Sequence, residues 1–274
     1  MVKRILLATD GSEAAGSAET LAEWMAYQLG AVLEVLYVCD QRWVRFTELV
    51  DVGAFSVPLP RYRSEVQDAL SAKGRAVLER LQTSATAASV VFEGRLESGI
   101  PAPVIVHESR KADLVVMGRH GEVHHGQTDG LGATAEKVVR SAVVPVIIAP
   151  LDYVKPDHLL VGYNGSEPSV RALHFAGPIA GALGLEVRVL ACHENSTRAA
   201  ELAAEGIEYF GAYGLEAQPL LLSGDPALQI TQAQEPTYLV ALGAFGGGPV
   251  RRLLLGSTTD YVLRFAVGPV LVVP

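Results

Sequence analysis

The sequence predicts an α/β protein made of two tandem open parallel-sheet α/β sandwich domains, Rossmann-like in arrangement. Short continuous apolar runs alternate with helical patterns along the chain, which is typical of strands buried on both faces of a parallel sheet. The chain also repeats itself, because "KRILLATDGSEAAGSAETL" near the start is matched by "DHLLVGYNGSEPSVRALHF" near the middle. Hydrophobic residues make up 49% of the 274 residues, enough for a substantial core. Ligands of such sheets bind near the carboxyl ends of the strands.

The elements of the first half follow from these patterns in order. Apolar runs predict strands and the longer amphipathic segments between them predict helices. The strands are expected at 5–9, 33–38, 90–94, 114–118 and 145–150, and the helices at 13–29, 64–87, 101–110 and 134–141.

Later stretches repeat in the same order, which indicates an internal duplication over nearly the whole chain. "SGIPAPVIVHESRKADLVVMG" pairs with "SGDPALQITQAQEPTYLVALG", and "AEKVVRSAVVPVIIAP" with "TDYVLRFAVGPVLVVP". The joint is "PLDYVKP", so we place the domains at 1–150 and 155–274. Cys39 and Cys192 each end a second strand, and we interpret them as repeat equivalents and small core residues.

The first half carries an insert at 41–63 that the second half lacks. The insert is rich in aromatic residues, valine and proline. It is either a packed surface loop or a lid or partner-docking segment, since long loops in compact domains are often functional.

Composition excludes several classes of protein. The net charge of −8 argues against general binding to nucleic acids or anionic membranes. Two cysteines provide no disulfide framework, and no apolar run is long enough to span a bilayer. The N-terminus leads directly into a strand-like pattern without a signal-peptide pattern, so the expected location is the cytoplasm.

The stretch "GAFGGGPVRRLLLGSTTD" follows a predicted strand and leads into a predicted helix. We expect Ser257 to be the N-cap of that helix, with Asp260 completing a capping box. Exposed amides and aligned peptide dipoles at a helix N-terminus attract anions, and Arg251 and Arg252 are close enough in sequence to add charge. The alternative is structural, because glycine loops often only turn corners.

The same crevice has a second set of candidates. Asn164 follows the first strand of the second half and can bond a ribose hydroxyl or a base edge. Ala191 and Cys192 end the next strand, where backbone could face a ring. Neither a Walker A motif nor a Gly-x-Gly-x-x-Gly fingerprint after a first strand is present, so a P-loop ATPase or an NAD enzyme is not supported.

These residues resemble the universal stress protein family in its tandem two-domain form, over essentially the whole chain. The resemblance depends most on Gly-x2-Gly-x9-Gly-Ser/Thr, which Gly243, Gly246, Gly256 and Ser257 match in full. It implies an adenine nucleotide alpha hydrolase-like fold and binding of ATP, with or without Mg²⁺, by a regulatory stress-response protein. The implied nucleotide positions are Asn164, Ala191, Gly243, Gly246, Gly256, Ser257 and Thr258 in the second half and Asp10, Val38, Gly118, Gly121, Gly132 and Thr134 in the first.

The first half departs from the motif. Gly132 comes one residue late, and Ala133 stands where the hydroxyl residue is expected, so we favour nucleotide binding in the second half. The same loop holds His120, His124 and His125, which bind zinc with Asp129 as a fourth ligand, reach a phosphate, or form a polar surface loop.

Three functions remain open at this stage. The preferred one is a non-catalytic nucleotide-binding regulator of an unidentified protein partner, because no lysine, general base or carboxylate pair accompanies the motif. The alternatives are a slow ATPase and an interaction scaffold with vestigial sites. The resemblance also implies pairing of "VPVIIAP" with "GPVLVVP" within one chain as an internal pseudo-dimer, with further homodimerisation left open.

Overall fold

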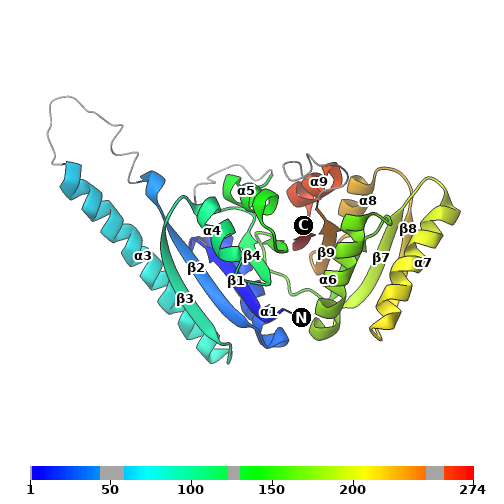
Figure 1. The fold of residues 1–274 in the computed structure, drawn as a ribbon, viewed down its shortest axis with the longest axis horizontal. Coiled ribbons are helices and arrows are strands. Elements are labelled where there is room, and N and C mark those ends of the chain that lie inside the picture. The colour runs from blue at the N-terminus through cyan, green and yellow to red at the C-terminus, as the bar shows by residue number, and fades with distance from the viewer. Residues whose placement is uncertain (1, 44–58, 123–129, 245–255) are drawn as a thin grey trace.

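The predicted α/β class is confirmed by a computed structural model that describes residues 2–43, 59–122, 130–244 and 256–274. Strands and helices alternate along the chain and build an open sheet covered by helices (Figure 1). Most of the 41–63 insert and most of the histidine-containing loop lie outside the described residues.

The first half contributes five strands to the sheet. These are β1 (Arg4–Thr9), β2 (Val32–Asp40), β3 (Phe92–Gly99), β4 (Leu114–Gly118) and β5 (Val146–Ala149). The helices between them are η1 (Glu13–Ala15), α1 (Gly16–Leu29), α3 (Leu59–Ala87), α4 (Pro101–Ser109) and α5 (Ala133–Ser141).

The second half contributes five more strands in the same alternation. These are β6 (His158–Gly162), β7 (Glu186–Cys192), β8 (Ala217–Leu222), β9 (Tyr238–Gly243) and β10 (Val270–Val273). The helices are α6 (Glu167–Leu183), α7 (Ser196–Ala212), α8 (Pro226–Ala233) and α9 (Ser257–Phe265).

The ten strands of the described residues form one sheet in the order β3-β2-β1-β4-β5-β10-β9-β6-β7-β8. Neighbouring strands are parallel within each half, while β5 and β10 pair antiparallel in the middle, with Ile147 opposite Leu271. The two terminal strands that the sequence analysis paired are therefore neighbours. This pairing covers the apolar edge that each half would otherwise expose.

The core lies on both faces of the sheet. One face packs against α1, α3, α6 and α7, with Met25 and Phe210 completely buried. The other face packs against α4, α5, α8 and α9, with Val138 and Val262 completely buried. Helices on both faces explain why the strand sequences are continuously apolar.

The sequence predictions were wrong at both ends of β3, at the start of α3 and in one alignment. Strand β3 begins at Phe92 and continues through polar residues because it is an edge strand, and α3 begins at Leu59. Leu36 on β2 and Leu190 on β7 occupy the same place in the strand registers. Cys39 is three residues beyond that place and Cys192 only two, so the two cysteines are not repeat equivalents.

The helices α5 and α9 lie side by side across the β5–β10 junction (Figure 1). Arg140 of α5 donates to Glu136 of its own helix and to Asp260 of α9, at 3.0 and 3.3 Å. Arg264 of α9 in turn donates to Asp260 at 2.9 Å. The candidate helices of the two halves are thus joined by charged side chains.

Arg119, directly after β4, makes a second contact between the halves. Its Nη2 donates to the carbonyl oxygen of Ala266, at the C-terminus of α9, at 2.6 Å. Cations stabilise the negative end of a helix dipole. Burial lowers the pKa of the Arg119 guanidinium.

An Arg119→Met variant is expected to lower the free energy of unfolding by about 2 kcal/mol, because the carbonyl oxygen of the buried Ala266, at the end of α9, loses a charged donor. Urea unfolding measures the change. Lys137→Met, which removes an exposed cation from α5, is the matched control and is expected to change the midpoint little. Equal midpoints for both variants would show that the Arg119 contact does not stabilise the protein.

Candidate functional site

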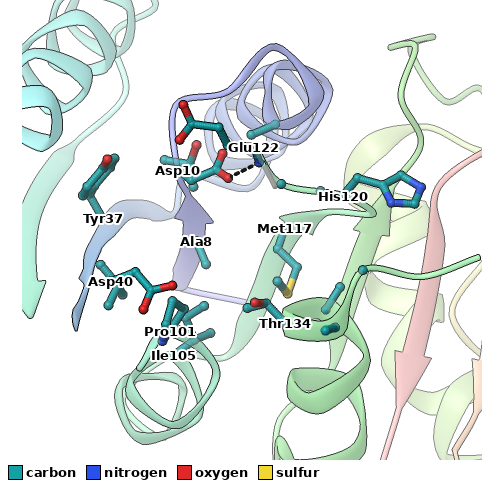
Figure 2. A pocket seen from close by; sticks show the side chains of 18 of the residues that line it. Ala8, Asp10, Tyr37, Asp40, Pro101, Ile105, Met117, His120, Glu122 and Thr134 are labelled. Carbon is teal, nitrogen blue, oxygen red and sulfur yellow. Dashed lines mark hydrogen bonds between the residues drawn. The ribbon is translucent and has the colours of Figure 1, made fainter. Parts of the chain in front are cut away.

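A pocket of about 900 Å³ opens at the carboxyl ends of β1, β2 and β4 in the first half (Figure 2). The start of α4 and the start of α5 close two of its sides. All six first-half positions implied by the family resemblance line this pocket: Asp10, Val38, Gly118, Gly121, Gly132 and Thr134. The structure therefore brings together residues that lie more than a hundred positions apart in the sequence.

Asp10 holds the loop after β4 against the end of β1. Its Oδ1 accepts from the amide and the hydroxyl of Ser12, at 3.0 and 2.6 Å. Its Oδ2 accepts from the backbone amide of Glu122 at 2.8 Å (Figure 2). A Cβ on Gly121 would lie 2.5 Å from that Oδ2, so this glycine permits the contact. A carboxylate has about four acceptor positions, so Asp10 retains capacity for a ligand hydroxyl.

The N-terminus of α5 forms the polar end of the pocket. Its N-cap is Gly132, with φ −61° and ψ 145°, and no side chain caps the first turn. Unpaired amides of a first turn attract anions. A Cβ on Gly132 would lie 3.0 Å from the carbonyl oxygen of Arg119, which explains a glycine there. Thr134, the second helical residue, also lines the pocket and offers a hydroxyl.

The opposite end of the pocket is mainly apolar. Val38, Ile105 and Met117 line it, and the ring of Tyr37 closes one side. Tyr37 is buried, and burial raises the pKa of its hydroxyl to about 12. The hydroxyl therefore stays protonated at neutral pH. A lining of this kind suits a flat heterocyclic ring.

The rim of the pocket continues beyond β2. Asp40 is held by Arg42, whose Nε and Nη2 donate to the carboxylate at 2.9 and 2.5 Å. Trp43 lines the same rim and is 52% exposed. The sequence analysis named none of these three residues as site candidates, and it treated Arg42 and Trp43 as part of the insert. Their position at and directly after the end of a second strand is a signal that was available.

The second half presents a matching helix start. Gly256 is the N-cap of α9, with φ −58° and ψ 143°, close to the values at Gly132. The expectation that Ser257 is the N-cap was wrong, since Ser257 is the first helical residue. Asp260 does not complete a capping box, because its carboxylate binds Arg264 and Arg140. Ser257 is exposed, and Thr258 follows it in the first turn.

The remaining second-half positions are only partly described. Asn164 is exposed, and its Oδ1 accepts from the amide of Ser166 at 3.1 Å. Gly243 ends β9, and the hydroxyl of Thr259 donates to its carbonyl oxygen at 3.1 Å, which fixes α9 to the strand. Gly246, Arg251 and Arg252 lie outside the described residues.

The sequence analysis named the wrong residue of β7 as the counterpart of Val38. The strand registers make Cys192, and not Ala191, that counterpart. Ala191 is completely buried on the face of the sheet that packs against α6 and α7. The Cys192 thiol donates to the carbonyl oxygen of Gly224 at 3.2 Å, on the other face.

The histidine loop is described only at its start. His120 is buried, and its ring points away from the pocket interior (Figure 2). His124, His125 and Asp129 lie outside the described residues. Within the described ranges, no group of three or more histidine, cysteine, aspartate or glutamate residues could hold a metal ion.

Comparisons with known proteins agree on one family. A family model described as "Universal stress protein family" matches residues 1–150 and 198–274. Universal stress protein Slr1230 of Synechocystis sp. is 26% identical over 98% of this chain and 99% of its own. Universal stress protein MJ0531 of Methanocaldococcus jannaschii is 31% identical over 54% of this chain and 82% of its own.

A solved structure is similar over the full length. The crystal structure of a universal stress protein from Archaeoglobus fulgidus has a TM-score of 0.74 and 26% identity, and covers 98% of this chain and 97% of that protein. Of the helices in the described part of this chain, none has the length and apolarity to cross a membrane.

Proposed function

The chain belongs to the universal stress protein family, and from this membership and its pocket we propose that it is a regulatory stress-response protein that binds an adenine nucleotide. Regulation here means that bound nucleotide changes how the protein engages an unidentified protein partner. We place this activity in the cytoplasm.

The observation that supports nucleotide binding is the two-ended pocket of the first half. Its apolar end, with Val38 and Ile105, suits an adenine ring. Its other end offers the amides of the first turn of α5 and the Thr134 hydroxyl to a phosphate. Asp10, which also lines the pocket, can accept a bond from a ribose hydroxyl. Base, sugar and phosphate thus each meet the chemistry that they need in one pocket.

We extend the proposal to the second half, because α9 begins with the same backbone geometry and adds the Ser257 hydroxyl. The two halves, at 1–150 and 155–274, then act as domains of an internal pseudo-dimer that pairs through β5 and β10. ATP, with or without Mg²⁺, is the proposed ligand of the second half. Asn164 carries no charge, so it would contact the sugar and not a metal ion.

Isothermal titration calorimetry of the full chain with ATP and AMP, each with and without Mg²⁺, tests the proposal. We expect saturable binding that weakens at least about tenfold when Val38→Trp fills the first pocket or Gly256→Val fills the approach to α9. No described atom lies within 4 Å of a Cβ built on Gly256, so we expect the described fold to accommodate this substitution.

Two matched variants control for the added bulk. Val91→Trp changes an exposed residue outside the pocket, and Gly211→Val changes a helical glycine whose Cβ also meets nothing within 4 Å. Absence of binding for every adenine nucleotide would refute the proposal in favour of a scaffold. Phosphate release that disappears with Gly256→Val would instead identify an ATPase.

A further inference from the structure

The first-half pocket carries more negative than positive charge in its described lining. Three carboxylates line it, those of Asp10, Asp40 and Glu122, and Figure 2 shows them around one opening. The lining includes only two cationic side chains, Arg42 and Arg119, among the residues that the structure describes. Asp40 pairs with Arg42 and Glu122 with Lys73, whereas no ion pair of Asp10 is found among the described residues. A ligand with several negative charges therefore meets the Asp10 carboxylate and no uncommitted cation of the described lining.

Both arginines are already engaged. Arg42 holds Asp40 through its Nε and Nη2, so its charge is largely neutralised. Arg119 turns toward the other half, where its Nη2 donates to the carbonyl oxygen of Ala266. Lys73, a nearby cation, binds the Glu122 carboxylate at 2.6 Å. To engage a polyphosphate, these cations would have to give up their present partners.

The start of α5 is weaker as a phosphate site than the start of α9. Its first residue is Ala133, whereas α9 begins with Ser257. Thr134 and the amides of the first turn remain, and these suffice for one phosphate group. Among the residues that the structure describes at this end of the pocket, no further side-chain donor stands free for the rest of a triphosphate chain.

The apolar end of the pocket, which suits a heterocyclic ring, has a more complete lining than the phosphate end at α5. Leu70, Pro101 and Ile105 form an apolar wall, and Trp43 presents an exposed aromatic face at the rim. The volume of about 900 Å³ lies within the usual range for small-molecule sites. An adenine ring and its sugar would therefore supply most of the binding energy in this pocket.

We propose that the first-half pocket takes an adenine compound of low charge, a nucleoside or a nucleoside monophosphate, in preference to a nucleoside triphosphate. This inference rests on the proposed function and specifies the ligand class of one of its two sites. The two halves would then respond to different adenine compounds, so one chain could sense their ratio.

Tryptophan fluorescence distinguishes the two halves. The chain has two tryptophans, Trp24 and Trp43. Trp24 is partly buried and packs against the core, away from the pocket lining. In a Trp24→Phe background, Trp43 is the only tryptophan, so its emission reports on the first-half pocket alone. Titrations with adenosine, AMP and ATP, with and without Mg²⁺, then compare the ligands at this site.

We expect adenosine or AMP to change Trp43 emission at concentrations about tenfold lower than ATP at low ionic strength. A Glu122→Gln variant is expected to strengthen ATP binding about threefold and to change adenosine binding little, because the change removes one negative charge and releases Lys73 from its partner, and only ATP carries charge. Glu216→Gln, an exposed substitution with the same charge change in the other half, is the control and is expected to leave both unchanged.

The outcomes separate the inference from the proposed function. ATP that binds at Trp43 as tightly as adenosine would overturn the inference and leave nucleotide binding intact. Calorimetric ATP binding without any change in Trp43 emission from the three ligands would also overturn it, and would place binding in the second half. If calorimetry detects no adenine compound at all, both the inference and the proposed function fail.

Discussion

Replacing Gly243 with alanine is expected to lower the free energy of unfolding by about 3 kcal/mol, whether or not a nucleotide is present. A Cβ at the end of β9 would overlap the carbonyl group of Pro168 and lie 2.6 Å from the Pro168 Cβ. Pro168 belongs to the first turn of α6, so backbone would have to move to relieve the overlap. Chemical denaturation of the ligand-free protein measures this loss directly.

Two other glycines of the motif pattern provide graded controls. A Cβ on Gly118, the first-half counterpart, would lie 3.2 Å from two carbonyl oxygens, so alanine there is expected to cost only about 1 kcal/mol. Gly256 has an ordinary φ of −58° and open space around its Cβ position, so alanine there is expected to change stability by less than about 0.5 kcal/mol.

This order separates two roles within one motif. The first glycine is required by the packing of the strand against the helix, and the glycine at the helix start leaves room where a ligand would approach. Equal stability of the Gly243→Ala and Gly256→Ala variants would contradict that division. The alternative raised in the sequence analysis, in which the motif glycines serve only the folding of the chain, would then explain neither glycine.

Removing both arginines that hold Glu34 is expected to destabilise the protein by about 4 kcal/mol at neutral pH. Glu34 lies on β2 with only 3% of its side chain exposed. It accepts from Arg4 of β1 at 3.1 Å and from Arg95 of β3 at 3.0 Å. Arg95 also binds Glu108 of α4, so the network joins three strands and a helix.

An Arg4→Met, Arg95→Met double variant leaves the buried carboxylate without a charged partner, and urea unfolding measures the cost. Adding Glu34→Met to the double variant is expected to recover most of the lost stability, because an apolar side chain needs no partner there. If the triple variant is no more stable than the double variant, the uncompensated carboxylate is not the cause of the loss.

The pattern of apolar residues along the chain identified the strands that are buried on both faces of the sheet. Strands β1, β4 and β5 were predicted within a residue or two because they are continuous apolar runs. Strand β3 was misplaced because its sequence, FEGRLESG, is that of a polar edge strand, and position in the sheet decides that. The N-cap of α9 was misassigned by one residue because Ser-x-x-Asp fits a capping box equally well, whereas Asp260 is drawn to arginines.

The sequence predicted which residues line the candidate site better than it predicted how those residues are arranged. The family resemblance gave the six first-half positions that line the pocket. It also favoured nucleotide binding in the second half, because the spacing from Gly118 to Gly132 is one residue longer than in the motif. In the structure, α5 begins at the same backbone geometry as α9 despite that residue. A loop can absorb an extra residue without moving the helix that follows.

The sequence by itself determined the alternation of strands and helices and the resemblance to the family, and it predicted the duplication, because burial periodicity and repeated motifs are properties of consecutive residues. The tertiary structure alone decided that β5 pairs with β10, that Val38 corresponds to Cys192, and that both arginines of the first pocket have partners. These facts depend on strand register and on contacts between distant segments. No local pattern encodes them, because the free energy of such contacts arises only when the segments pack together.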